Sequence, residues 1–213
     1  MAFITFEGGE GSGKSTQMTL FMEFLKSRGV DAIATREPGG APGAEAIRQL
    51  LVAGEPGRWD AMTETLLHTA ARRDHLTRVI VPALNSGQWV VSDRFADSTA
   101  AYQGHGHGVD LALIDGLYRI VASELKPDLT LILDLDLDRG LERAAGRAEA
   151  AGENEDRYEK MDRAFHERLR QGFLAIAAAE PARCKMIDAA GSEAEVQARI
   201  IAAAKAQFLD DLS

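Results

Sequence analysis

The stretch with the clearest chemical meaning is a glycine-rich run near the N-terminus, Gly8-Gly-Glu-Gly-Ser-Gly-Lys-Ser15. It fits GxxxxGK[ST], the phosphate-binding loop (P-loop), in which glycines let backbone N–H groups turn inward around an anion. Lys14 would bridge the β- and γ-phosphates of a nucleotide, and Ser15 would offer its hydroxyl to Mg²⁺. The predicted ATP-binding residues here are Gly8, Gly9, Glu10, Gly11, Ser12, Gly13, Lys14, Ser15 and Thr16.

Two further apolar runs each deliver an arginine and a carboxylate directly after they end. Arg36-Glu37 follows one run, and Asp93-Arg94 follows another. Each pair alone could be a surface ion pair. Repeated beside a phosphate loop, the pattern instead favours arginines that fork onto phosphate oxygens and Asp93 as a ligand of hydrated Mg²⁺, with Ser15.

The elements that must position these residues are short apolar runs alternating with helical patterns. Helical spacing is clearest from Met18 to Leu25, with a stop at Gly29. The alternation predicts a three-layer α/β fold in which a five-stranded parallel sheet is flanked by helices, with ligands beyond the carboxyl ends of the strands. The predicted strands are Phe3–Phe6, Ala32–Ala34, Trp89–Val91, Leu129–Leu133 and Lys185–Ile187.

The composition and net charge of the chain exclude several classes of protein. Hydrophobic residues make up 46% and charged residues 27% of the 213, which excludes a disordered chain, and no linker divides residues 1–213, so one domain is expected. The net charge of −9 argues against a protein that binds nucleic acid through the electrostatic field of its whole surface. A lone Cys184, no signal peptide and no membrane-length apolar run lead us to expect a cytoplasmic protein with no membrane partner.

These motifs, taken together, resemble the bacterial thymidylate kinases. The resemblance extends from the first predicted strand to the last helix and is more specific than the P-loop alone. It implies a P-loop nucleoside monophosphate kinase that forms a homodimer and catalyses Mg·ATP + dTMP → ADP + dTDP. The residues that carry it are Phe6-Glu-Gly8, Thr35-Arg-Glu-Pro-Gly-Gly40, Leu66-Leu-His-Thr-Ala-Ala-Arg72, Asp93-Arg-Phe95 and Ser98-Thr-Ala-Ala-Tyr-Gln-Gly104.

The resemblance also implies an acceptor site. The arginine matching Arg72 binds the monophosphate, the glutamine matching Gln103 reads the thymine edge, and the tyrosine matching Tyr102 lies against the sugar. Clustered fixed cations suit this role, because the acceptor and ATP are both anions. The implied substrate-binding residues are Arg36, Glu37, Arg48, His68, Arg72, Arg94, Ser98, Tyr102 and Gln103.

The segment 143–157 resembles the lid of this family, and it is polar and contains glycines. Because the P-loop holds no arginine, the sequence resembles the class that supplies a catalytic arginine from the lid, with Arg147 the best candidate. Arg143, expected at the end of the preceding helix, would then stack on adenine, and Arg157 would help clamp phosphates. The catalytic residues implied are Lys14, Arg94 and Arg147, with Arg143 or Arg157 as alternatives to Arg147.

The roles of several other residues have more than one interpretation from the sequence. Glu10 could hold Mg²⁺ through water or repel a wrong substrate. His105 and His107 could suggest a metal site, but two histidines without a third nearby ligand are more typical of a loop. A long helix is expected over Thr63–Leu84, interrupted by Pro82. This helix and Ile114–Val121 carry more apolar residues than one core-facing side requires, which fits either a dimer interface or ordinary core packing. Cys184 is expected to be an inert buried thiol.

Two other functions compete. A kinase for another nucleoside monophosphate would share the P-loop, lid and arginines, but not the combination of Ser98, Tyr102 and Gln103. A GTPase-type switch or regulatory ATPase would bind nucleotide to recruit partners. The chain lacks the Asn-Lys-x-Asp motif that reads guanine, since its only asparagines are Asn85 and Asn154.

His68 stands where the family usually has phenylalanine, one helical turn before Arg72. Residues four apart share a helix face, so a ring here can stack on a base while the arginine holds its phosphate. We predict that His68→Phe retains activity and that His68→Ala mainly raises the KM for the monophosphate in steady-state assays. Unchanged kinetics in the alanine variant would remove His68 from the site.

Overall fold

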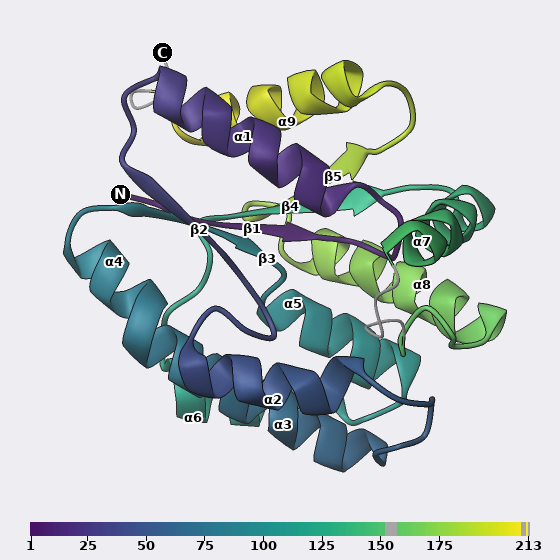
Figure 1. The fold of residues 1–213 in the computed structure, drawn as a ribbon. Coiled ribbons are helices and arrows are strands. Elements are labelled where there is room, and N and C mark those ends of the chain that lie inside the picture. The colour runs from purple at the N-terminus through teal and green to yellow at the C-terminus, as the bar shows by residue number, and fades with distance from the viewer. Residues whose placement is uncertain (152–156, 210–211, 213) are drawn as a thin grey trace.

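The computed structural model describes residues 1–151, 157–209 and 212; side chains are not described at 145 and 147–151. Five strands and the helices between them follow one another along the chain (Figure 1). The strands are β1 (Phe3–Glu7), β2 (Ala32–Arg36), β3 (Trp89–Asp93), β4 (Leu129–Asp134) and β5 (Cys184–Asp188). The helices are α1 (Lys14–Ser27), α2 (Pro42–Val52), α3 (Ala61–His75), α4 (Val81–Asn85), α5 (Ala96–Thr99), α6 (Leu111–Ala122), α7 (Leu137–Ala151), α8 (Arg163–Ala179) and α9 (Glu193–Gln207), with π-helical turns η1 (Leu76–Ile80) and η2 (Ala100–Gly106).

The sheet is parallel throughout and has the strand order β2-β3-β1-β4-β5. All five predicted strands are confirmed, each slightly longer than its apolar run. β1 and β4 lie inside the sheet and are buried almost throughout, as expected for strands covered by helices on both faces. The predicted α/β fold is therefore confirmed.

Helices cover both faces of the sheet and make separate apolar layers. α1 and α9 lie on one face, where Phe21, Leu25 and Ile200 pack against Phe6 and Leu131 of the strands (Figure 1). On the other face, β3 packs against η1, α4 and α6, and η2 and α8 pack against β4 and β5. Cys184 is buried at the start of β5, and burial raises the pKa of its thiol to about 12, as expected for an inert cysteine.

The helix expected over Thr63–Leu84 is present as α3, η1 and α4, with the π-helical turn η1 as its irregular part just before Pro82. One helical prediction needs correction. The helix before the lid is expected to end at Arg143, but residues 143–151 belong to α7, so Arg143 lies within a helix instead of at its end. Alanine-rich sequence explains the difference, because alanine has the highest helix propensity and outweighs one glycine. Residues 152–156 of the predicted lid lie outside the described residues.

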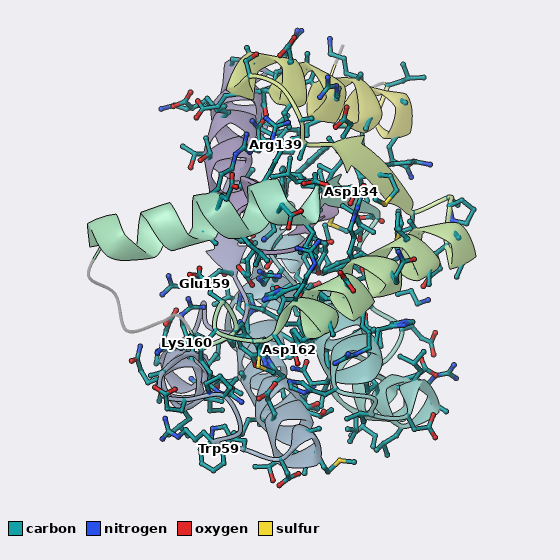
Figure 2. The ribbon with its side chains drawn as sticks, turned by 90° about the vertical axis from the view of Figure 1, so that its right-hand side faces the viewer. Trp59, Asp134, Arg139, Glu159, Lys160 and Asp162 are labelled. Carbon is teal, nitrogen blue, oxygen red and sulfur yellow. The ribbon has the colours of Figure 1, made fainter. Side chains whose placement is uncertain are left out.

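α7 projects from the rest of the structure, and the segment with Glu159 and Lys160 lies below it (Figure 2). The first turns of α7 lie against the P-loop. A Cβ added to Gly11 would lie 1.9 Å from the carbonyl oxygen of Gly140, in the first turns of α7. Only glycine at position 11, where φ is +66°, allows the two backbones to approach this closely. In the described part of the chain, no helix combines the length and apolar character needed to cross a membrane.

Candidate active site

The predicted site residues come together around one cavity of about 440 Å³ at the carboxyl ends of β1, β2 and β3. Its walls also include parts of α2, α3 and η2 and the segment that follows residue 156. A cavity of this size suits a nucleotide-sized ligand. The predicted residues that line it are Glu10, Gly11, Gly13, Lys14, Ser15, Thr16, Arg36, Glu37, Arg48, His68, Arg72, Asp93, Arg94, Ser98, Tyr102 and Gln103.

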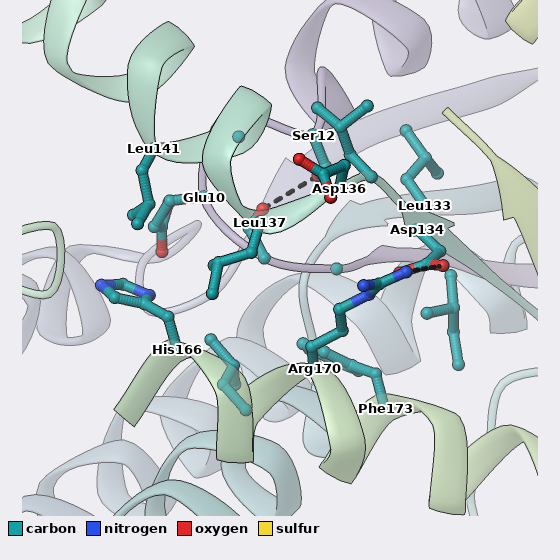
Figure 3. A pocket seen from close by; sticks show the side chains of 16 residues that line it. Glu10, Ser12, Leu133, Asp134, Asp136, Leu137, Leu141, His166, Arg170 and Phe173 are labelled. Carbon is teal, nitrogen blue, oxygen red and sulfur yellow. Dashed lines mark hydrogen bonds and ion pairs between the residues drawn. The ribbon is translucent and has the colours of Figure 1, made fainter. Parts of the chain in front are cut away.

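The remaining predicted residues lie elsewhere. Gly8, Gly9 and Ser12 face a smaller cavity under the P-loop, between the end of β4, the start of α7 and α8 (Figure 3). Arg143 is an exposed residue of α7 and lines neither cavity. Arg147 also belongs to α7, but its side chain lies outside what the structure describes.

The P-loop joins β1 to α1 and has the backbone its glycines predict. Gly8, Gly11 and Gly13 take positive φ angles of 132°, 66° and 88°. Lys14 Nζ donates to the carbonyl oxygens of Gly8 and Gly9, at 3.1 and 2.8 Å. Burial, with help from the charge of Arg94, lowers the Lys14 pKa to about 8. The loop therefore holds its lysine folded back against its own carbonyl groups.

Ser15, the last residue of the P-loop motif, and Asp93, at the end of β3, bring two oxygen-bearing side chains together. Ser15 Oγ donates to Asp93 Oδ2 at 2.8 Å. The other carboxylate oxygen, Asp93 Oδ1, is buried and accepts no hydrogen bond from the described residues. A buried carboxylate oxygen in this state suits a hard cation that takes oxygen ligands, so these two residues fit Mg²⁺.

Arg94 lies between the P-loop and the opposite wall of the cavity. Its backbone has a φ of +69°, which is uncommon for a residue with a side chain and typical of functional sites. The guanidinium donates to Gly8 O at 3.1 Å and to Glu10 Oε1 at 2.9 Å, and lies 5.0 Å from the Tyr102 ring centre. Tyr102 donates its hydroxyl to the same Glu10 oxygen at 2.5 Å. Glu10 thus orients both Arg94 and Tyr102.

Arg72 is 3% exposed and is held in place by the residue that follows β2 and by two residues at the ends of α5. It donates to Glu37 Oε2 at 2.8 Å, Phe95 O at 3.1 Å and Thr99 Oγ1 at 2.9 Å. Glu37 also lies 3.1 Å from His75 Nδ1. Since so many contacts fix the Arg72 side chain, its charge is in position before any ligand arrives.

The two other predicted arginines occupy the rim of the same region. Arg36 makes an ion pair with Glu45 at 3.1 Å and is half exposed. Arg48 Nη1 donates to Pro38 O at 2.9 Å. With Arg72 and Arg94, they place four guanidinium groups around one cavity in a protein of net charge −9. Such a cluster can hold a phosphate group close to a second anion.

The far end of the cavity carries the residues predicted to contact a base. His68 Nε2 and the hydroxyl of Tyr158 lie 2.9 Å apart, and Gln103 Nε2 donates to Glu64 Oε1 at 2.8 Å. Burial lowers the His68 pKa to about 4, so this imidazole is neutral near pH 7. Ser98 lies nearer the phosphate loop, where its hydroxyl donates to Glu7 Oε2 at 2.5 Å.

Sequence reasoning missed the buried carboxylates that support these residues. Glu7 accepts from the Phe95 backbone N–H at 2.7 Å, and burial, together with nearby Asp97, raises its pKa to about 8. Glu64 supports Gln103 from behind. Glu7 stood inside a quoted motif, and Glu64 precedes His68 by one helical turn, a spacing that could have pointed to it.

Arg157 has a different place from the one predicted. Its side chain is 2% exposed, pairs with Glu64 and donates to Leu51 O at 2.7 Å. It does not line the cavity, so in this structure it is not positioned to clamp phosphates. His107, considered as a metal ligand, lies 3.5 Å from Glu64 and against the Phe165 ring.

The lowered Lys14 pKa predicts a pH dependence of nucleotide binding. Phosphate oxygens stabilise the charged amine, so the Lys14 pKa is higher in the bound state than the value of about 8 without ligand. ATP binding therefore takes up a proton above pH 8, and affinity falls by up to about tenfold per pH unit there. Calorimetric titration with ATP between pH 6.5 and 9.5 measures this. A Kd that stays constant up to pH 9.5 would contradict it.

Comparison with known proteins identifies the family. The thymidylate kinase family model matches residues 6–200. Thymidylate kinases of Rhizorhabdus wittichii and Caulobacter vibrioides are 51% and 56% identical over 201 and 187 residues, covering 94% and 88% of this chain and 95% and 88% of theirs. The crystal structure of thymidylate kinase from Ehrlichia chaffeensis superposes with a TM-score of 0.75 at 37% identity, covering 94% of this chain and 97% of that one. The cavity, its arginines and these matches lead to one conclusion, that this chain belongs to the thymidylate kinase family.

Proposed function

We infer that this protein catalyses the thymidylate kinase reaction, in which ATP and dTMP give ADP and dTDP. Membership of the family over most of the chain is the observation that carries this conclusion. The larger cavity supports it, because the P-loop and the four arginines that line it suit two phosphate-bearing ligands facing each other. A nucleotide-dependent switch would have no use for the second anion site.

For the chemical step, we propose direct transfer between the two ligands. A phosphate oxygen of dTMP attacks the γ-phosphorus of ATP, and the bond to the β–γ bridging oxygen breaks to release ADP. Lys14 and Arg94 neutralise charge on the migrating group, while Arg72 holds the acceptor, with Arg36 and Arg48 nearby. A phosphate monoester is largely doubly ionised near pH 7, so the attacking oxygen needs no general base.

Mg²⁺ is the cofactor that these residues fit. Ser15 and Asp93 would hold it, and the unsatisfied Asp93 Oδ1 supports this assignment. When bound, the ion would neutralise charge on the phosphates of ATP. The chain's own part is to keep two oxygen ligands fixed beside the P-loop.

At the base end we propose that Gln103 reads the thymine edge and that His68 and Tyr102 flank the nucleoside. All three line the cavity, and neutral His68 can stack on a base without adding charge. Ser98 is bound to Glu7 and lies 3.2 Å from Arg94, so it supports the arginine as well as facing the ligand.

A direct test is ADP formation in the presence of dTMP, dUMP, UMP, CMP, AMP or GMP, each with ATP and Mg²⁺. We expect turnover that depends on the acceptor, because the arginines lining the cavity suit a second anion beside the P-loop, and that is fastest with dTMP, as the family membership indicates. Steady ADP release without any acceptor would support a regulatory ATPase. A preference for another monophosphate would overturn the assignment of dTMP.

We further propose that residues 1–213 form one kinase domain whose lid is segment 143–157 and that Arg147 reaches the transferred phosphoryl group. α7 supports this, because it begins against the P-loop at Gly140 and projects beyond the core (Figure 2). Arg143, being exposed on α7, is the nearest alternative.

Arg147→Ala is expected to lower kcat by about 10³-fold or more with little change in either KM, because an arginine that acts on the transferred group works in the transition state. Initial-rate kinetics with both substrates varied measure this. Arg139→Ala, on the first turn of the same helix, serves as the matched control and should keep kcat. Equal kcat in Arg147→Ala would move the role to Arg143, because Arg157 is buried against Glu64.

A homodimer, implied by the family resemblance, remains a proposal, as does a cytoplasmic location. α3 and α6 pack against each other and expose apolar side chains, including Leu66 at 48% and Ile120 at 77%. Such a surface is typical of a face covered in a dimer. Sedimentation should show a dimer that Ile120→Glu weakens and Leu209→Glu, a similarly exposed leucine, does not. A monomeric wild-type protein would refute this.

A further inference from the structure

Next to the base end of the cavity lies a buried carboxylate, Glu64, that has no part in the proposed phosphoryl transfer. Glu64, in the first turn of α3, is 1% exposed and does not line the cavity. Both of its oxygens are nevertheless bound. Oε1 accepts from Gln103 Nε2 at 2.8 Å, and Oε2 accepts from Arg157 Nη2. The side chain that faces the base is therefore held from behind by a buried acid.

Glu64 is ionised in this environment. Burial raises the pKa of its carboxyl group, but the hydrogen bond and charge of Arg157 outweigh burial and hold the pKa below its usual value. Arg157 is itself fixed, because it is 2% exposed and also donates to Leu51 O. A carboxylate in this state has no proton to donate and can only accept hydrogen bonds.

This restriction decides how the Gln103 amide is turned. Only its NH₂ group can face an ionised carboxylate, since the opposite orientation would bring two oxygens into contact. The amide oxygen is then the atom that Gln103 has left for a ligand in the cavity that it lines. We propose that Glu64 is a positioning residue for base selection, holding Gln103 so that its oxygen accepts the N3–H of thymine.

Base chemistry turns this orientation into specificity. Thymine and uracil carry a donor at N3, whereas cytosine carries an acceptor at the same ring position. Oε1 of Gln103 therefore attracts the first two and repels the third. A free glutamine amide could rotate and satisfy either pattern, because its two ends differ in polarity but hardly in shape. Glu64 prevents that rotation.

Glu64 also connects the segment after residue 156 to the base end of the cavity, through its ion pair with Arg157. Arg157 N–H donates to Val52 O at 3.4 Å, and the Arg157 guanidinium lies 5.2 Å from the ring centre of Tyr158, which lines the cavity and contacts His68. Loss of the Glu64 charge would therefore disturb both Gln103 and Tyr158. An experiment must separate the turn of the amide from this wider loosening.

The test compares dTMP with 5-methyl-dCMP, which has almost the same shape but an acceptor in place of the N3–H donor. The ratio of their kcat/KM values is measured for the full-length wild type, Glu64→Gln, Gln103→Leu and the double variant. We expect Glu64→Gln to reduce the ratio at least tenfold, mainly through faster reaction of 5-methyl-dCMP, with the KM for ATP unchanged. In the Gln103→Leu background, Glu64→Gln should change the ratio less than twofold, because Glu64 then has no amide to orient.

Two results would overturn the proposal. One is a ratio in Glu64→Gln within twofold of the wild type. The other is an equal loss in both backgrounds, which would mean that Glu64 acts through general packing. If Glu64→Gln does not fold, as judged by its melting curve, Gln103→Leu keeps the proposal falsifiable, since a wild-type ratio there excludes selection by the amide and leaves Glu64 nothing to orient.

The proposal rests on the proposed function, yet the two can fail separately. A wild-type protein that forms no ADP in response to dTMP would overturn the assigned reaction. Normal turnover of dTMP together with unchanged selectivity in Glu64→Gln would overturn only the role of Glu64.

Discussion

The structure depends on one electrostatic constraint: an acidic protein must hold cations still in the place where two anionic ligands meet. It does so by pairing its site arginines with carboxylates. Arg72 is bound to Glu37, Arg94 to Glu10, and Arg36 to Glu45. Each pair fixes a guanidinium before the ligand binds, so little reorganisation is left for the reaction itself. The two largely buried pairs, Arg72–Glu37 and Arg94–Glu10, contribute more to orientation than to stability, because burying charges costs much of the free energy that their attraction returns.

The parallel sheet makes this arrangement possible. β1, β2 and β3 are neighbours in the sheet, and their carboxyl ends lead into the P-loop, Arg36-Glu37 and Asp93-Arg94. The positive φ of Arg94 turns its side chain back toward the loop, where Gly8 O and Glu10 receive it. Buried Glu7 holds the following turn through the Phe95 backbone. Local backbone geometry and long-range contacts thus specify the same position.

Much of this could be predicted from sequence, for reasons that differ between residues. The strands and the P-loop follow from local patterns, since a run such as Leu129–Leu133 or the spacing of Gly8 to Ser15 carries its meaning within a few residues. The pairing of Glu64 with Arg157 spans 93 positions and leaves no local pattern, so the sequence does not predict the place of Arg157. In residues 143–151 the polar residues and the glycine indicate a flap, whereas the alanines favour a helix, and the structure follows the alanines.

The close approach of Gly11 and Gly140 fixes the first turns of α7 against the P-loop, so that any tilt of the helix is centred there. From Gly140 to the last residue of the helix is about 16 Å at 1.5 Å per residue. A tilt of about 10° around that point therefore swings the tip by about 3 Å while the loop beneath moves hardly at all. Because glycines stand at both contact points, the backbone of the P-loop and that of α7 meet without intervening side chains, so a shift of the loop would be passed to the helix directly and would be largest at the far end of α7.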